Sequence, residues 1–319
     1  MTLRIAVQMD PLERINIAGD STFAIMLKAQ DLGHELYWYA PEDLSWAEGR
    51  LWTMGYPVTV QRVAGSHYSF GEPRILDLGR DVDVVLMRQD PPFDLGYITA
   101  THLLERTQSE TLVVNDPASV RNAPEKIWVL DFPQFMPPTA ITRSLGLARK
   151  FLGEHGDIVI KPLHGFAGGS VFRIGSDGRN LASLMELFNR TYREPHVIQK
   201  FLPEIAQGDK RIVLVDGEVA GAINRVPGEG EIRSNLAVGG KGQKAELTAR
   251  EEEICATLGP ELKKRGLLFV GIDVIGGQWL TEINVTSPTG IVAIDEFNGT
   301  DTPALIWQAI ERRLERSDA

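Results

Sequence analysis

Three oxygen-bearing side chains near the end of the sequence are spaced so that they could hold a divalent metal ion. Residues 280–285 read as a strand, on which successive side chains alternate faces, so Glu282 and Asn284 point the same way. Asp273 lies on the preceding strand of the same predicted hairpin, roughly opposite them. Carboxylate and amide oxygens suit a Mg²⁺ ion that is shared with substrate phosphates. The alternative is an ordinary solvated face of a hairpin.

A predicted strand that ends in a lysine leads into a loop of small residues. Lys161 closes the apolar run 158–160, and Gly168, Gly169 and Ser170 follow shortly after it. Such a loop lets backbone N–H groups approach phosphate oxygens, and the lysine would add a positive charge. It is not a Walker A loop, because the order Gly-x4-Gly-Lys-Ser/Thr is absent. A flexible connection between strands is the alternative.

Positive charge gathers in one part of a chain that is acidic overall. The sequence holds 33 Lys and Arg against 43 Asp and Glu, a net charge of −10, which disfavours a generic nucleic-acid or anionic-membrane binder. Arginine grips carboxylate or phosphate with two parallel N–H groups, so a local cluster could still bind an anionic substrate. Solvated surface charge is the alternative. The cluster comprises Lys210, Arg211, Arg225, Arg233 and Lys241.

A further arginine, Arg88, stands at the C-terminal end of the predicted strand 82–87. Open α/β sheets bind ligands at that end of their strands, so Arg88 is a candidate for substrate binding. The alternative is an ion pair in the loop, with Asp90 or Asp94.

The elements that must position these side chains change character along the chain. At about 150 residues per domain, 319 residues suit two domains or three small ones. The first third alternates short apolar runs with helical patterns, including a helix capped by Asp20, and this predicts a parallel α/β sheet. The middle reads as a small α+β unit. The last third contains two hairpins, with turns at Asp216-Gly217 and Gly276-Gly277, and helices over 248–265 and 303–316.

The stretch 227–242 holds five glycines and has no apolar periodicity. Loops of this length are uncommon and are usually functional or disordered. We expect it to be a mobile lid over the site, since it carries Arg233 and Lys241 and has little apolar surface to bury.

Cysteine content and hydropathy indicate the compartment. Cys255 is the single cysteine, which excludes an intramolecular disulfide and a Cys-rich zinc site. No apolar run reaches the roughly 18 residues of a membrane span. The first residues lead straight into a strand-like run rather than a signal peptide. We therefore expect a cytoplasmic protein that has no membrane or nucleic-acid partner.

Taken in order, these segments resemble the prokaryotic glutathione synthetase family, which belongs to the ATP-grasp superfamily. The most specific string is Thr-Glu-Ile-Asn-Val-Thr-Ser-Pro-Thr-Gly at 281–290, and the resemblance spans nearly the whole chain. The other segments that resemble the family are Met9-Asp10-Pro11, Ile15-Asn16-Ile17, Asp20-Ser21, residues 87–94, 122–126 and 161–163, Gly208-Asp209-Lys210-Arg211, residues 235–237 and Gly271-Ile272-Asp273.

The resemblance implies the fold class and the reaction. It implies an α/β protein with an N-terminal parallel-sheet (pre-ATP-grasp) domain over 1–122 and a two-part α+β ATP-grasp module, with its central lid over 123–202 and its C-terminal domain over 203–319. The implied reaction is ATP-dependent ligation of γ-glutamylcysteine and glycine to glutathione through an acyl phosphate, with release of ADP and phosphate. It also implies Mg²⁺, which Mn²⁺ could replace, and a homotetramer.

The resemblance also implies four sets of site residues. The implied metal ligands are Asp273, Glu282 and Asn284. The residues around the reacting phosphate are Arg211, Arg225, Arg233 and Asn235. The ATP-binding set is Lys126, Lys161, Gly168, Gly169, Ser170, Gln199, Lys200, Phe201, Leu202, Asp209 and Lys210. The set nearest the small substrates is Asp20, Ser21, Arg88, Ser287, Pro288, Thr289 and Gly290.

One loop departs from the family pattern Lys-Pro-Leu-Asp-Gly-Met-Gly-Gly. Here His164 replaces the Asp, and Phe166-Ala167 replaces Met-Gly, so the role of that Asp is in doubt. The small residues that would bring backbone N–H groups to phosphate remain.

Three other functions compete with this reading. A glutamate-adding or D-alanine-adding ATP-grasp ligase would differ only in its substrates. A nucleotide-binding module without turnover would not need the full set of candidate metal ligands and lysines. A dehydrogenase is disfavoured, because the only dinucleotide-type pattern, residues 240–245, follows no apolar strand.

Overall fold

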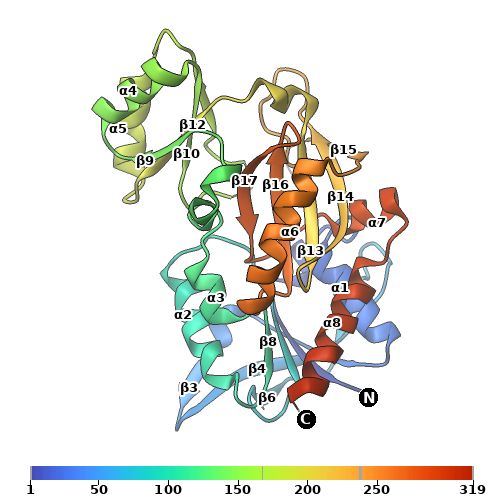
Figure 1. Cartoon of the computed structure of the whole chain (residues 1–319). Coiled ribbons are helices and arrows are strands. Elements are labelled where there is room, and N and C mark those ends of the chain that lie inside the picture. Colours follow the sequence, from blue (N-terminus) through green and yellow to red (C-terminus); the bar gives the residue numbers. More distant parts are fainter. Residues whose placement is uncertain (1, 167, 237–238, 318–319) are drawn as a thin grey trace.

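The computed structural model describes residues 2–166, 168–236 and 239–317, and these fold into three sheets (Figure 1). The first sheet lies within residues 4–114, the second within 139–200 and the third within 209–284. One sheet falls in each of the three predicted units, while the boundaries at 122 and 202 stay a prediction. Among these described residues, no helix is long and apolar enough to cross a bilayer.

The first sheet has a parallel centre and antiparallel additions. Its strands are β1 (Arg4–Gln8), β2 (Glu35–Tyr39), β3 (Ser45–Ala47), β4 (Arg50–Val60), β5 (Tyr68–Phe70), β6 (Arg74–Asp77), β7 (Val84–Met87) and β8 (Leu112–Val114). β1 pairs in parallel with β2 and β7, and β7 with β8, as the alternation of strands and helices predicts. β4 pairs antiparallel with β2, β3, β5 and β6, a meander that the sequence reading did not anticipate.

Helices cover both faces of the first sheet, and one of them comes from the other end of the chain. α2 (Leu95–Leu104) and α3 (Pro117–Asn122) pack on one face, while α1 (Ser21–Asp31) and α8 (Thr302–Ser317) pack on the other (Figure 1). The side chain of Asp20 accepts a hydrogen bond from Phe23 N, so it caps α1 as predicted. The indole Nε1 of Trp307 donates to Ile25 O at 2.9 Å and ties α8 to α1.

The second sheet is antiparallel and has a small core of its own. Its strands are β9 (Thr139–Thr142), β10 (Ile158–Pro162), β11 (Phe172–Ile174) and β12 (His196–Lys200), in the order β11-β10-β12-β9. α4 (Leu145–His155) and α5 (Leu181–Thr191) pack against it. Among the described residues, none from the other two sheets belongs to this core, and in Figure 1 the unit stands apart at the top of the molecule.

The third sheet shares its cores with the first. Its strands are β13 (Asp209–Val215), β14 (Glu218–Val226), β15 (Lys241–Lys244), β16 (Phe269–Ile275) and β17 (Trp279–Asn284), with α6 (Ala249–Lys264) and α7 (Ile291–Asn298) packed against it. The order is β15-β14-β13-β16-β17, and every neighbouring pair is antiparallel. Both predicted hairpins form, and all four turn residues, Asp216, Gly217, Gly276 and Gly277, have the positive φ of a tight hairpin turn.

Candidate active site

The three sheets meet at a cleft of about 590 Å³, a volume in the usual range for ligand pockets. Its walls come from the loops after β7 and before α1, from the second sheet and its glycine-rich loop, and from the third sheet. Most predicted site residues line it. They are Asp20, Lys126, Lys161, Gly168, Gly169, Gln199, Lys200, Phe201, Leu202, Asp209, Arg211, Arg225, Arg233, Asn235, Asp273, Glu282, Asn284, Ser287, Pro288, Thr289 and Gly290.

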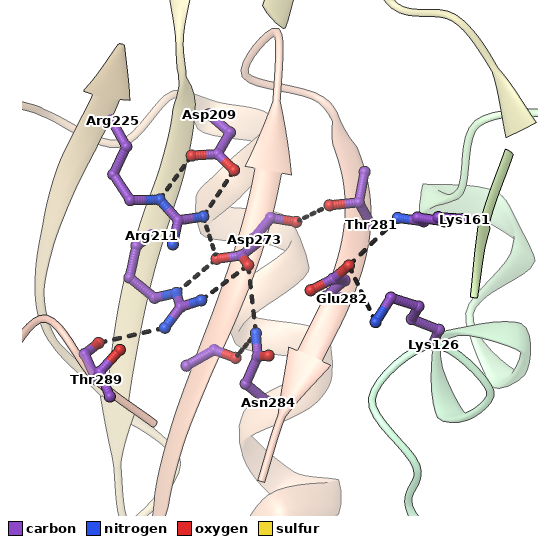
Figure 2. A network of polar contacts seen from close by, with 11 residues as sticks. Lys126, Lys161, Asp209, Arg211, Arg225, Asp273, Thr281, Glu282, Asn284 and Thr289 are labelled. Carbon is purple, nitrogen blue, oxygen red and sulfur yellow. Dashed lines mark hydrogen bonds and ion pairs between the residues drawn. The ribbon is translucent and has the colours of Figure 1, made fainter. Parts of the chain in front are cut away.

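The three candidate metal ligands lie together on β16 and β17. Asp273 is the direct partner of Glu282 across the two strands, as the hairpin spacing predicts. Asn284 Nδ2 lies 3.4 Å from Asp273 Oδ2 and donates at 3.1 Å to Gly271 O, which leaves its own oxygen for other contacts (Figure 2). Two carboxylates and an amide oxygen are hard donors, so the residues fit a Mg²⁺ ion.

Two arginines hold Asp273 from one side. Arg211 donates to its two oxygens at 2.5 and 2.9 Å, and Arg225 approaches it at 2.9 Å (Figure 2). Burial alone would raise the pKa of Asp273, but the charges of Arg211 and Arg225 outweigh burial and hold that pKa well below its ordinary value. Asp273 is therefore ionised at neutral pH.

Asp209 completes this arrangement from the first strand of the third sheet. It is the direct partner of Arg225 across β13 and β14, and Arg225 donates to its two oxygens at 2.7 and 2.6 Å. Burial favours loss of the Arg225 proton, but Asp273 and Asp209 outweigh this and raise the pKa of Arg225. We call Asp209, Arg211, Arg225 and Asp273 the clamp, because all four side chains are buried and paired within the group.

Two lysines from different elements converge on Glu282. Lys161 Nζ, at the end of β10, lies 3.3 Å from Glu282 Oε1, and Lys126 Nζ, from the loop after α3, lies 3.6 Å from the same atom (Figure 2). Burial acts to raise the pKa of Glu282, but the two lysine charges prevail and lower it. The sequence reading associated both lysines with phosphate, and the structure brings them to one point.

The glycine-rich loop after β10 faces a second loop across the cleft. Gly168 has φ of 72°, and a Cβ there would lie 2.7 Å from Asn235 Oδ1, so only glycine permits this approach. Ala167 lies outside the described residues. His164, which replaces the family's Asp, packs its ring against Phe93 with centroids 5.8 Å apart, and burial lowers its pKa. His164 therefore joins the loop to the first unit as a neutral, packed side chain.

The Gln199–Leu202 stretch forms an apolar end of the cleft. Gln199 Nε2 donates to Thr139 Oγ1 at 2.9 Å, which fixes the side chain beside the wall. Apolar side chains that the sequence reading missed surround it, namely Val159, Val171, Ile205 and Ile275. Val159 and Ile275 lie on strands whose cleft-facing sides are known only from the sheet pairing, whereas Val171 and Ile205 lie in the segments beside the strands.

The opposite end of the cleft joins the first unit to the loop after β17. Ser21 Oγ accepts a hydrogen bond from Gly290 N at 3.1 Å, and Ser287 Oγ lies 3.3 Å from Arg88 O. Arg88 donates from Nε to Thr22 Oγ1 at 3.0 Å and from Nη2 to Pro288 O at 2.8 Å. It forms no ion pair with Asp90 or Asp94 within the described part of the chain, so that alternative fails.

Four predicted site residues do not line the cleft. Arg88 and Ser21 lie just behind its wall and position the loop 287–290. Ser170 Oγ is occupied by Tyr192 OH at 3.1 Å. The prediction that Lys210 lines the ATP site is wrong. Its Nζ donates to Glu251 Oε2 and Glu246 O on the opposite face of β13. Neighbours on a strand point to opposite faces, so Asp209 and Arg211 reach the cleft while Lys210 cannot.

One carboxylate in the cleft was missed altogether. Glu125 precedes Lys126 and accepts a hydrogen bond from Thr286 Oγ1 at 3.0 Å. Burial raises its pKa, with Lys126 opposing the rise. The sequence signal that could have identified Glu125 is its position directly before Lys126, the lysine assigned to the ATP phosphates, but the sequence analysis did not use it.

Comparisons with known proteins show the family of the chain. Residues 3–121 match the model of the prokaryotic glutathione synthetase N-terminal domain, and residues 125–299 match that of the prokaryotic glutathione synthetase ATP-grasp domain. The chain is 56% identical to a glutathione synthetase of Bradyrhizobium diazoefficiens over 98% of this chain and 99% of that one. It is 52% identical to the glutathione synthetase of Agrobacterium fabrum over 98% of each.

Solved structures share the fold at low sequence identity. D-cycloserine synthetase DcsG superposes with a TM-score of 0.69 at 17% identity, covering 97% of this chain and 99% of that one. D-alanyl-alanine synthetase A from Vibrio cholerae gives 0.61 at 14% identity, covering 98% of each. These likenesses concern the fold alone.

Proposed function

This chain belongs to the prokaryotic glutathione synthetase family, and we propose that the cleft between its sheets is where it makes glutathione. It is an ATP-dependent ligase of the ATP-grasp fold that joins γ-glutamylcysteine to glycine. The observation that carries the assignment of the cleft is the convergence of Lys126 and Lys161 on Glu282 beside the clamp.

The chemistry explains why ATP is needed. A carboxylate does not react with an amine unaided, because oxide is a poor leaving group. Transfer of the γ-phosphoryl group to the cysteinyl carboxylate forms a C–O–P linkage and releases ADP. The glycine amine then attacks the carbonyl carbon, the C–N bond forms, the C–O bond breaks, and phosphate leaves with the electron pair while the amine loses a proton. Such a reaction needs positioning and charge neutralisation more than covalent help from the protein.

The two lysines and Glu282 form an exchangeable set of charges. In the structure, Lys126 and Lys161 neutralise Glu282. When phosphates enter, we propose that both Nζ groups turn to phosphate oxygens and free Glu282 for metal binding. Asp273, Glu282 and Asn284 would hold Mg²⁺, or Mn²⁺ in its place. The ion would neutralise phosphate charge during transfer.

The arginines act at the transferred group. Arg211 and Arg225 are held in fixed orientations by two buried carboxylates, so their remaining N–H groups are pre-set toward the cleft. We propose that they stabilise the phosphoryl group and the oxyanion of the tetrahedral intermediate. Arg233 and Asn235 approach from the loop above, opposite Gly168.

The dipeptide occupies the end of the cleft next to the first unit. Asp20 and the loop 287–290 line this end, and Ser21 and Arg88 hold that loop from behind. The Gln199–Leu202 stretch, with its apolar neighbours, then takes the adenine at the other end. This order of the parts along the cleft supports a γ-phosphoryl group that lies between the adenine end and the dipeptide end.

Phosphate release tests the proposal directly. With ATP and Mg²⁺, release should require γ-glutamylcysteine, and steady release should require glycine and give glutathione in equal amount. Lys161→Met should abolish both, whereas Lys150→Met, an exposed lysine on α4, should change neither. Equal phosphate release with D-alanine or glutamate in place of glycine would overturn the substrate assignment. Phosphate release that does not depend on γ-glutamylcysteine would overturn the proposed reaction.

Location and assembly rest on the resemblance. We propose a cytoplasmic enzyme, because the dipeptide carries a free thiol that a reducing compartment preserves. We also propose a homotetramer.

A further inference from the structure

The proposed reaction requires a group that takes a proton from glycine. Glycine enters as an ammonium ion, whose nitrogen has no lone pair with which to attack a carbonyl carbon. It must lose one proton before it reacts and a second as the C–N bond forms. A positioned side chain within hydrogen-bond reach commonly takes such a proton, and a carboxylate is one of the groups that do so. The charge of the ammonium group also calls for a negative partner in the cleft.

Most carboxylates that line the described part of the cleft are already paired. In the clamp, both carboxylates accept hydrogen bonds from arginines on both of their oxygens. Glu282 lies against two lysines. Glu125 differs, because its Oε1 accepts one hydrogen bond, from Thr286 Oγ1 at 3.0 Å, and no side chain of the described residues donates to its Oε2. Glu125 therefore has an oxygen free for a ligand of the cleft that it lines.

Glu125 lies where the phosphoryl site meets the dipeptide end of the cleft. It directly precedes Lys126, one of the two lysines assigned to phosphate, and its backbone O accepts a hydrogen bond from Ile283 N on β17 at 3.0 Å. Its side chain is bound by Thr286, which directly precedes the loop 287–290 assigned to the dipeptide. The carbonyl carbon that glycine attacks carries the phosphoryl group on one side and the dipeptide on the other. Glu125 is therefore next to the point where the C–N bond would form.

Two other carboxylates of the cleft belong to the dipeptide end instead. Asp20 and Asp90 line the cleft at the first unit. Burial lowers the pKa of the Arg88 guanidinium, and the charges of Asp20 and Asp90 oppose that effect, so both lie beside Arg88. Burial raises the pKa of Glu125, and the charge that opposes the rise is that of Lys126. Glu125 is thus the carboxylate better placed to meet an amine that attacks the acyl phosphate.

We infer that Glu125 receives glycine: its carboxylate binds the ammonium group, aims the nitrogen at the acyl phosphate and takes the first proton. The inference rests on the proposed function, since it concerns the second half of that reaction. The nitrogen lone pair then forms the C–N bond, and the C–O bond breaks. The departing phosphate keeps the electron pair of that bond, takes the second proton and leaves as hydrogen phosphate. Glu125 returns its own proton to water, and Thr286 holds its carboxylate in place throughout.

A nucleophile that needs no base tests the inference. Hydroxylamine is uncharged at neutral pH and attacks an acyl phosphate directly, so ATP, Mg²⁺, γ-glutamylcysteine and hydroxylamine should give a hydroxamate in place of glutathione. Glu125→Gln keeps the shape of the side chain but cannot take a proton, so glutathione formation should fall by about 10²- to 10⁴-fold. Hydroxamate formation by the same variant should stay near that of the wild type. The KM for glycine should rise, while those for ATP and γ-glutamylcysteine should not change.

The two products separate the possible outcomes. Equal loss of glutathione and hydroxamate would mean that Glu125 serves the phosphoryl site or the fold, and would overturn the inference, as would unchanged glutathione formation. A wild-type enzyme that makes glutathione but no hydroxamate would overturn the acyl phosphate of the proposed function, and the inference with it. Glu154→Gln, an exposed residue on α4, is the matched control and should change neither product.

Two milder variants keep the inference testable if Glu125→Gln does not fold. Glu125→Asp retains a carboxylate that is one methylene farther from the nitrogen, and it should make less glutathione than the wild type and normal amounts of hydroxamate. Thr286→Val removes the O–H group that holds Oε1, and it should slow glutathione formation by about tenfold with little effect on hydroxamate. Denaturant melts show that each variant is folded. If both variants lose the two products in the same proportion, Glu125 has no role specific to glycine.

Discussion

Asp273 on β16 and Gly168 in the loop after β10 line the same cleft, but their surroundings differ in kind. Asp273 is buried and held by Arg211 and Arg225 through three contacts of 2.5 to 2.9 Å. Gly168 lies in an exposed loop whose approach to Asn235 involves no side chain of its own. The side chains to which we assign the reacting atoms are fixed by ion pairs within the protein, whereas the loops to which we assign ligand entry and closure have few such contacts.

The strongest way to break this comparison is to remove the carboxylate at the centre of the clamp. Asp273→Asn keeps the shape of the side chain but removes one of the two buried negative charges that pair with Arg211 and Arg225. The free energy of unfolding should therefore fall by about 3–5 kcal/mol. Turnover should fall by about 10²- to 10³-fold or more, since the arginines lose their orientation. Denaturant melts and phosphate release check both effects.

Asp83→Asn is the control for that experiment. Asp83 pairs with Arg4 where the two side chains are 31% and 40% exposed, so its loss should cost less than about 1 kcal/mol. If the two variants unfold alike, the clamp is no more rigid than a surface pair.

A second change removes the negative charge of Glu282, the carboxylate that Lys126 and Lys161 contact. Glu282→Gln should lower turnover by about 10- to 100-fold, because a metal ligand becomes a weaker one. The deficit should shrink as Mg²⁺ is raised, which a titration of phosphate release would measure. Glu186→Gln, an exposed residue on α5, should leave the Mg²⁺ dependence unchanged. Normal activity of Glu282→Gln at limiting Mg²⁺ would contradict the metal assignment.

The stability that Asp273 contributes should depend on pH, because its pKa is shifted in the folded protein. The folded pKa of Asp273 lies below its ordinary value of 3.8, so its contribution is fully present above about pH 4 and is lost as pH falls through the folded pKa. The stability gap between wild type and Asp273→Asn should therefore be constant from pH 7 to 5 and shrink below pH 4. Melts at fixed ionic strength measure the gap, and one that widens toward low pH would give the wrong sign for this shift.

A smaller effect is expected behind the cleft wall. Arg88→Lys keeps the charge, but one ammonium group cannot reach both Thr22 and Pro288 O. Loss of one charged hydrogen bond should raise the KM for the dipeptide by about tenfold and leave that for ATP unchanged. Arg62→Lys, an exposed substitution in the first unit, is the control. An equal rise in both constants would show that Arg88 only supports the fold.

The smallest effect should come from the loop that holds Arg233. The backbone N–H groups of Glu231, Gly239 and Gly240 donate hydrogen bonds only to nearby carbonyls, those of Gly228, Leu236 and Asn235 respectively. Trypsin should cut the free enzyme at Arg233, and ATP, Mg²⁺ and γ-glutamylcysteine together should slow cutting by about tenfold. Residues 237 and 238 lie outside the described residues, so the lid stays a prediction. Cleavage that is equally fast with ligands present would make the segment a plain connector.

Local patterns predicted the parts of the site that depend on one hairpin. The pairing of Asp273 with Glu282 follows from strand alternation and a two-residue turn. Lys210 was misplaced because it was assigned by its charge and by the family resemblance, and strand alternation was not applied to residues 209–211, which lie together on β13. Applying strand alternation there would have excluded Lys210 from the cleft.

Long-range packing explains what the sequence did not reveal. Glycine and proline disfavour the interior of a strand, yet β4 runs through Gly55 and Pro57. A Cβ at Gly55 would lie 2.2 Å from Leu76 Cδ1. Glycine is there because a neighbouring strand's side chain occupies the space, which no local pattern records. Arg88 likewise depends on Pro288, which is 200 residues away.

Because α8 packs on the first sheet, that sheet cannot finish folding until the end of the chain has been synthesised. Ile306, Trp307 and Ile310 share one core with β1 and α1, which are made first. Because the chain emerges from its N-terminus, that face of the first sheet stays bare until the last helix has left the exit tunnel. The first unit of this enzyme is therefore the earliest to be translated and among the last to be completed.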